Sequence, residues 1–106
     1  MGAKRHGNRR FSWDDDKRRK VRRDHGIDLA DLPAAFDGPT LEMEAQEHHI
    51  DGLRMKILAL SRGNVAVIVY TEIDDSSEVR LITAWRANKV EQSLYYQTFF
   101  GETYGE

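Results

Sequence analysis

Apolar residues concentrate in three short runs within the second half of the chain. The runs cover residues 55–60, 65–71 and 78–86, and the first two are separated by Ser61, Arg62, Gly63 and Asn64. A short connection containing Gly and Asn between β-branched runs is typical of a β-hairpin. Three consecutive strands pair most simply as an antiparallel meander. Run 65–71 is apolar at nearly every position, which predicts a strand covered on both faces, whereas run 78–86 should expose one face.

Capping signals predict two helices before this meander. Asp14 is a favourable N-cap and Gly26 can end a helix in the left-handed conformation, so we expect a helix over residues 15–24. Asp28 can cap a second, short helix over residues 29–36. The apolar residues of this second helix recur at helical spacing and should face the sheet; they are Leu29, Leu32 and Phe36.

The remaining patterns predict two edge strands and a last helix. Residues 11–13 and 41–45 alternate between apolar and polar side chains, as short edge strands do. Asn88 can cap a C-terminal helix. Val90, Leu94 and Tyr95 recur at the spacing of one face of this helix. The fold class is therefore α+β, with a small, mainly antiparallel sheet, two N-terminal helices and one C-terminal helix.

The length of 106 residues fits one domain. Residues 1–10 are basic and lack apolar periodicity, so we expect a disordered arm followed by a single domain over residues 11–106. The chain has no cysteine, which excludes disulfides, thiolate metal sites and a cysteine nucleophile. No apolar stretch is long enough for a membrane span and no signal peptide is visible, so a cytoplasmic location is expected.

Charge is distributed unevenly along the chain. Residues 1–23 carry ten Lys or Arg against three Asp, and residues 24–51 carry eight Asp or Glu and no Lys or Arg. The formal net charge of −2 therefore does not exclude a polyanionic partner. A basic block is nevertheless more often a solvated face than a nucleic-acid site.

Several short motifs in order carry a resemblance to a known family. They are Phe11-x-Trp13-Asp14-x-x-Lys17, His25-Gly26-Ile27, Phe36-Asp37, Arg54, residues 67–71, and residues 80–84 followed by Glu91 and Tyr95. Over roughly residues 11–96 the chain resembles BrnT-type toxins of type II toxin-antitoxin systems, within the RelE-like toxin group. The resemblance implies a RelE-like fold and ribosome-independent RNA cleavage. It also implies a cognate ribbon-helix-helix antitoxin, through which alone the complex binds operator DNA.

Four positions depart from the pattern that this resemblance implies. They are Val21, Asp24, Gly52 and Trp85, the last of which stands where an arginine is frequent. An alternative is therefore a catalytically weak or inactive homologue that serves as the antitoxin-binding partner in an autorepressor complex. A third alternative is a nucleic-acid-binding module without chemistry.

Arginines at strand ends are the candidates for RNA cleavage. Metal-free cleavage by the 2′-hydroxyl needs cationic donors for the charge that develops on the phosphate, and the guanidinium group binds phosphate bidentately. Arg54 begins one strand, and Arg80 and Arg86 lie six residues apart on another, so the strand period predicts that all three share a face. Surface salt bridges with the surplus acidic residues are the alternative role.

Other candidate site residues lie outside the meander. His25 is a further catalytic candidate, although a helix cap explains it equally well. Lys17, Tyr95 and Tyr96 are candidates for RNA binding, the tyrosines by stacking on bases. Lys17 can instead form helical ion pairs with the flanking Asp residues, and helix spacing favours a core position for at least one of the tyrosines. The candidates for antitoxin binding are Arg18, Arg19, Arg22 and Arg23. Adjacent His48 and His49 lack the spacing that focuses metal ligands, so no metal or cofactor is predicted.

Overall fold

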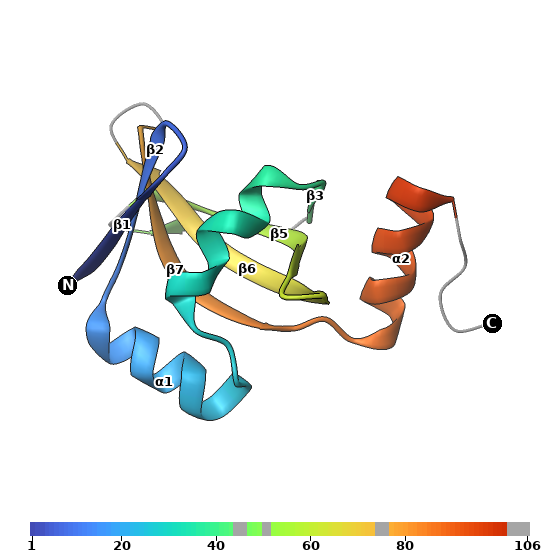
Figure 1. Cartoon of the computed structure of the whole chain (residues 1–106), viewed down its shortest axis with the longest axis horizontal. Coiled ribbons are helices and arrows are strands. Elements are labelled where there is room, and N and C mark those ends of the chain that lie inside the picture. The colour runs from blue at the N-terminus through green and yellow to red at the C-terminus, as the bar shows by residue number, and fades with distance from the viewer. Residues whose placement is uncertain (44–46, 50–51, 74–76, 102–106) are drawn as a thin grey trace.

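One mixed β-sheet with helices on its faces forms the structure (Figure 1). The computed structural model describes residues 1–43, 47–49, 52–73 and 77–101. The strands are β1 (Gly2–His6), β2 (Arg9–Trp13), β3 (Thr40–Glu42), β4 (Glu47–His49), β5 (Gly52–Ser61), β6 (Asn64–Ile73) and β7 (Glu78–Arg86). The helices are α1 (Asp15–His25), the 3-10 helix η1 (Leu29–Asp37) and α2 (Lys89–Phe100). The strand order is β1-β2-β7-β6-β5-β3, and β4 also pairs with β5.

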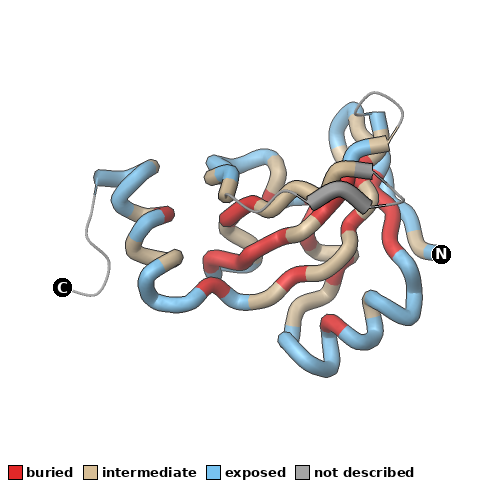
Figure 2. Tube along the Cα trace, turned by 180° about the vertical axis from the view of Figure 1, so that it is seen from behind, coloured by how far each residue is buried: buried red, intermediate tan, exposed pale blue. Residues whose placement is uncertain are grey.

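The predicted meander is present. Strands β5, β6 and β7 pair antiparallel, and Ser61 pairs with Asn64 across a two-residue turn. β6 is buried at most positions, with Val67 and Ile68 fully inaccessible on opposite faces. Figure 2 shows that buried segments concentrate in these central strands, whereas α1 and α2 are mostly exposed. The apolar run therefore predicted the central strand correctly.

The N-terminal part of the sheet differs from the sequence prediction. Residues 2–6 form a strand, not a disordered arm, and β1 pairs antiparallel with β2 across a tight turn in which Gly7 has a positive φ of 61°. Strand β2 is not an edge strand, because it also pairs with β7, and it does so in parallel. The sheet is consequently mixed, although its other pairs are antiparallel.

Side-chain contacts explain this unexpected pairing. Ser12 Oγ donates a hydrogen bond to Glu78 Oε2 at 2.7 Å, and Arg9 forms an ion pair with Glu72 at 2.8 Å. Both contacts join β2 to segments more than 60 residues away in the sequence. A pattern of neighbouring residues cannot predict contacts over such a separation. Gly2 lies directly against Trp13, and a Cβ atom at this glycine would be 2.0 Å from the indole nitrogen.

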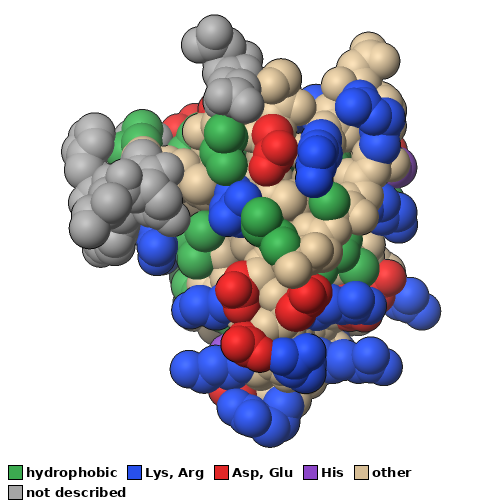
Figure 3. All heavy atoms as spheres, turned by 90° about the vertical axis from the view of Figure 1, so that its left-hand side faces the viewer, with side chains coloured by type: hydrophobic (Ala, Val, Ile, Leu, Met, Phe, Trp, Pro, Cys, Tyr) green, Lys and Arg blue, Asp and Glu red, His purple; other side chains and the backbone are tan. Residues whose placement is uncertain are grey.

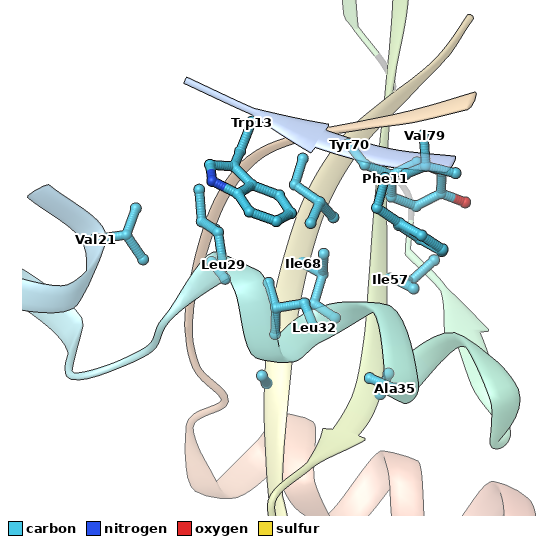
Figure 4. Close-up of a cluster of buried hydrophobic side chains, with 14 residues drawn as sticks. Phe11, Trp13, Val21, Leu29, Leu32, Ala35, Ile57, Ile68, Tyr70 and Val79 are labelled. Carbon is cyan, nitrogen blue, oxygen red and sulfur yellow. The ribbon is translucent and has the colours of Figure 1, made fainter. Parts of the chain in front are cut away.

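The first two helices form where the capping signals place them. Asp14 accepts a hydrogen bond from the amide of Lys17, and Gly26 ends α1 with a φ of 69°. Asp28 likewise accepts from the amide of Ala30, but the second helix is a 3-10 helix throughout. Pro33 within it has no amide donor, which weakens continuous α-helical hydrogen bonding. Figure 4 shows side chains of η1 and β2 packed together over the central strands.

The C-terminal helix begins at the predicted cap but turns a different face to the sheet. Asn88 and Glu91 form a capping box. Val90 and Leu94 are 78% and 49% exposed whereas Tyr95 is fully buried, so the three residues do not form one buried face of the helix. Aromatic packing sets this orientation, because the Tyr95 and Phe99 rings are 5.0 Å apart in the second core cluster. Of the predicted strand 41–45, residues 41–42 lie in β3 and residues 44–45 lie outside the described residues.

Candidate functional site

Polar side chains form a row across four neighbouring strands. Ser12 of β2 pairs with Arg80 of β7, Arg80 pairs with Thr71 of β6, and Thr71 pairs with Arg54 of β5. Residues directly opposite each other in a sheet project from the same face. Thr71 is 1% exposed and its hydroxyl donates to the carbonyl of Leu53 at 2.9 Å. The register therefore places the Arg54 and Arg80 side chains on one face, on either side of a small buried threonine.

The N-terminal half of α1 closes this face into a cleft. The cleft has a volume of about 420 Å³, and its lining includes Arg54, Arg80, Lys17 and Lys20. Lys17 and Lys20 lie three residues apart and so share one side of the helix. Figure 3 shows that basic side chains gather over α1 at the lower end of the molecule, with acidic side chains between them. Four cationic side chains from three elements thus surround one cavity.

Arg80 is oriented by contacts within the sheet. Its Nε donates to Ser12 Oγ at 2.8 Å, and Ser12 in turn donates to Glu78. One terminal nitrogen of Arg80 is 3.8 Å from Glu78 Oε2, which is too long for a hydrogen bond. Within the described part of the chain, the terminal N–H groups of Arg80 therefore keep their hydrogen-bonding capacity for a ligand. A guanidinium group fixed through Nε presents its other donors in a defined direction.

The carboxylates that line the cleft are already engaged. Asp14 caps α1 by accepting from the amide of Lys17 at 3.0 Å, and Asp16 forms an ion pair with Arg19. The ammonium groups of Lys17 and Lys20 make no ion pair with any residue that the structure describes. The cleft is therefore cationic, and its donors suit an anion with several oxygen atoms.

Arg86 does not join Arg54 and Arg80, so the prediction that the three arginines share a face is wrong. Val69 pairs with Thr83 whereas Tyr70 pairs with Leu81, so Ile82 is an extra residue that forms a β-bulge. A bulge shifts the alternation of side chains by one position. Arg86 consequently projects from the opposite face and lines a different cleft, together with Arg22 and Arg62.

Comparison with known families identifies the family of this chain. Residues 13–91 match the model of a family described as the ribonuclease toxin BrnT of type II toxin-antitoxin systems. The chain belongs to the BrnT family. The residues that line the cleft, Lys17, Lys20, Arg54 and Arg80 among them, all lie within the matched segment.

A solved BrnT structure has the same fold. The 1.1 Å crystal structure of the Brucella abortus ribonuclease toxin BrnT superposes with a TM-score of 0.60 and 20% sequence identity. The match covers 74% of this chain and 95% of the Brucella chain. A search of the curated proteins found no match. None of the described helices has the length and apolar character needed to cross a membrane.

The structure separates His25 and Tyr95 from the cleft of this BrnT-family chain. His25 is exposed at the last position of α1, eight residues after Lys17, which corresponds to about 12 Å along the helix. Tyr95 is fully buried and its hydroxyl donates to the carbonyl of Pro39 at 2.8 Å, so it has no surface on which a base can stack. Tyr96 is partly buried and lines a small cavity of about 70 Å³ beside Arg86.

The four arginines assigned to antitoxin binding have different surroundings. Arg18 donates two hydrogen bonds to Asp28, at 2.7 and 2.9 Å, and its guanidinium carbon lies 5.9 Å from the Trp13 ring centroid. The hydrogen bond from Arg18 holds the pKa of the Asp28 carboxyl below its ordinary value. Arg18 therefore ties α1 to η1, whereas the other three arginines, Arg19, Arg22 and Arg23, are exposed.

Sequence reasoning missed one basic residue of the cleft and the residues that position its arginines. Lys20 carries a signal that was available, because it follows Lys17 at helical spacing. Ser12, Thr71 and Glu78 carry none, since their role depends on the parallel pairing of β2 with β7 and on the register of β6. The side chains of His48 and His49 lie outside the described residues.

Proposed function

We propose that this BrnT-family chain is a metal-independent endoribonuclease that cleaves RNA through attack of the 2′-hydroxyl on the adjacent phosphate. The observation that supports the proposal most directly is the register of β5, β6 and β7, which sets Arg54 and Arg80 on either side of Thr71. Lys17 and Lys20 face them across the same cleft. A phosphate between these groups would meet donors on two sides.

Each step of the reaction has a candidate group in the cleft. The guanidinium groups of Arg54 and Arg80 would stabilise the negative charge that develops on the non-bridging oxygens. An ammonium of Lys17 or Lys20 can donate a proton to the departing 5′-oxygen. The carboxylate oxygen of Asp14 or Asp16 that is not engaged with the Lys17 amide or with Arg19 can accept the 2′-hydroxyl proton. Ser12 and Glu78 would not touch the substrate but would hold Arg80 in position.

The proposed chemistry predicts a specific product and no requirement for a divalent ion. Purified protein incubated with labelled single-stranded RNA should release fragments ending in a cyclic phosphate or a 3′-phosphate, at the same rate with and without EDTA. RNA with a 2′-deoxyribose at the cleaved position should remain intact, because the nucleophile is missing. Loss of cleavage in EDTA, or cleavage of the deoxy substrate, would contradict this mechanism.

The orientation of Trp85 supports a second candidate function, that of a weak or inactive toxin homologue that only binds the antitoxin. Trp85 pairs with Val67 and so projects from the face that also carries Arg54 and Arg80. Its ring lies 5.7 Å from the ammonium of Lys56. The frequent arginine at this position would place a further cation on that face. This alternative replaces the first if the protein neither cleaves RNA nor arrests growth but still binds its antitoxin tightly.

Antitoxin binding is proposed to use the exposed basic side of α1. The partner would be the small ribbon-helix-helix protein encoded beside the toxin, and only this partner would contact operator DNA. Reversal of Arg19 and Arg23 to glutamate should slow association of the antitoxin by at least tenfold at low salt, because exposed charges mainly steer encounter. Stopped-flow mixing at two ionic strengths measures this effect. Arg18 stays unchanged in this variant, since its bonds to Asp28 stabilise the fold. Equal association rates would remove this surface from the interface.

A further inference from the structure

A second basic cleft lies on the sheet face opposite to the first. It has a volume of about 370 Å³, and three arginines from separate elements line it: Arg22 from the last turn of α1, Arg62 from the β5–β6 turn and Arg86 from the end of β7. Arg86 reaches this face only because of the bulge at Ile82. Asp28 and Asp31 form part of the wall.

The conformation of Arg62 is not explained by stability. Its φ of 51° makes it the one residue other than glycine with a positive φ among those that the structure describes. Asn or Gly is strongly preferred at this position of a two-residue hairpin turn, because other side chains are strained there. The ion pair of Arg62 with Asp31 spans 3.4 Å and the Arg62 side chain is 77% exposed, so the pair offsets little of this strain. Strain at a cleft mouth points to a use for the guanidinium group.

The acidic residues of the cleft leave two of its arginines available. Both carboxylate oxygens of Asp28 accept hydrogen bonds from Arg18, and Arg22 approaches Asp28 only to 4.0 Å. Arg86 forms no ion pair with any described residue. Asp31 stands beside Arg62 and can hold its side chain over the opening. The cleft therefore retains a net positive charge, and three separate elements contribute its guanidinium groups.

We propose that this second cleft binds a backbone phosphate of the RNA substrate at a distance from the cleaved bond. The inference rests on the proposed function, because it assumes that the first cleft holds RNA. Helix α1 lines both clefts, with Lys17 and Lys20 at one and Arg22 and Gly26 at the other. Along the axis of α1, Lys17 and Arg22 are five residues or about 8 Å apart, a separation that a strand of a few nucleotides can span.

Continuity of charge favours RNA over an acidic protein segment in this cleft. A polyanion seated at Arg54 and Arg80 would leave the first cleft along a helix whose exposed residues are largely basic. Arginine forks match the spacing of phosphate oxygens, and each further phosphate contact adds affinity without sequence preference. The second cleft would thus position longer RNA and contribute little to the chemical step.

The test is a binding measurement that does not depend on cleavage. The probe is a fluorescent single-stranded oligonucleotide with 2′-O-methyl riboses, long enough to span both clefts, and its anisotropy is followed over a range of salt concentrations. Arg62→Asn and Arg86→Ala should each raise Kd by roughly threefold to tenfold and lower the slope of log K against log salt by about 0.7 to 1. Arg5→Ala is the matched control, because it removes the same charge from an exposed residue of β1 that lines neither cleft.

Arg62→Asn also separates binding from folding. Asparagine tolerates a positive φ, so this variant should melt at or above the temperature of the wild type while it binds the oligonucleotide more weakly. With active protein, both cleft variants should raise KM for long RNA and leave kcat and the cleavage of a dinucleotide unchanged.

Three results would overturn the inference. The first is a Kd and a salt slope for both variants equal to those of Arg5→Ala. The second is weaker antitoxin binding with unchanged oligonucleotide binding, which would assign the cleft to the antitoxin. The third is wild-type protein that does not bind the oligonucleotide. If the wild type binds through this cleft but does not cleave unmodified RNA, only the proposed enzymatic function fails.

Discussion

Alanine in place of Arg80 should lower the rate of RNA cleavage by about two to three orders of magnitude, the scale expected when one donor to a developing oxyanion is lost. Arg80 is held by Ser12, and it lines the same cleft as Lys17 and Lys20. Arg54→Ala should have an effect of similar size, because its register with Thr71 places it on the same face. Single-turnover cleavage of labelled RNA measures both rates.

Two further variants separate this role from general electrostatics and from folding. Arg86→Ala removes an equal charge from the opposite face and should change the single-turnover rate at saturating RNA by less than about threefold, because phosphate contacts remote from the reaction mainly affect binding. Arg80→Lys keeps the charge but cannot form the same fork with Ser12 and phosphate, so most of the loss should remain. If Arg86→Ala were as slow as Arg80→Ala, or if Arg80→Lys were fully active, the proposed centre would be wrong.

Ser12 provides a test of positioning. Ser12→Ala removes the acceptor for Arg80 Nε and should slow cleavage less than Arg80→Ala does, with kcat reduced more than binding. Its effect should disappear in the Arg80→Ala background, because the serine acts only through that arginine. An additive double variant would show that Ser12 has another role.

Local signals in the sequence predicted the parts of the fold that depend on neighbouring residues. The helix caps predicted at Asp14, Gly26 and Asn88 are the caps that the structure shows. They could be predicted because capping depends on residues close to the helix end. The meander was predicted for the same reason, since its strands are joined by short connections. The parallel pairing of β2 with β7 depends on contacts such as that of Ser12 with Glu78, 66 residues apart, and could not be predicted locally.

The difference between local and long-range signals also explains which residues of the candidate site could be predicted. Arg54, Arg80 and Lys17 were identified from strand ends and from the family resemblance, and the structure brings them into one cleft. Arg86 was assigned to the same face by counting six residues along a regular strand. The extra residue Ile82 moves Arg86 to the opposite face of the sheet. This bulge arises from the pairing of β7 with β6, and no turn signal in the sequence marks it.

Truncation of Tyr95 to alanine should have the largest effect on stability, reducing the free energy of unfolding by about 3 to 5 kcal/mol. Tyr95 lies beyond the segment matched by the family model, yet it is fully buried and joins α2 to the second core cluster. Tyr95→Phe removes only the hydrogen bond to the Pro39 carbonyl and should cost about 1 kcal/mol. Urea denaturation followed by circular dichroism measures both changes.

Tyr96 is the matched control for Tyr95, because it is the next residue on the same helix and is only partly buried. Tyr96→Ala should cost clearly less stability than Tyr95→Ala, since less apolar area leaves contact with the core. Base stacking and core packing predict opposite patterns for Tyr95. A stacking residue would lose RNA binding on truncation and keep its stability, whereas a core residue loses stability first. Two results together would contradict the core role of Tyr95. They are an unfolding free energy of Tyr95→Ala within about 1 kcal/mol of the wild type, and a loss of RNA binding larger than that of Tyr96→Ala.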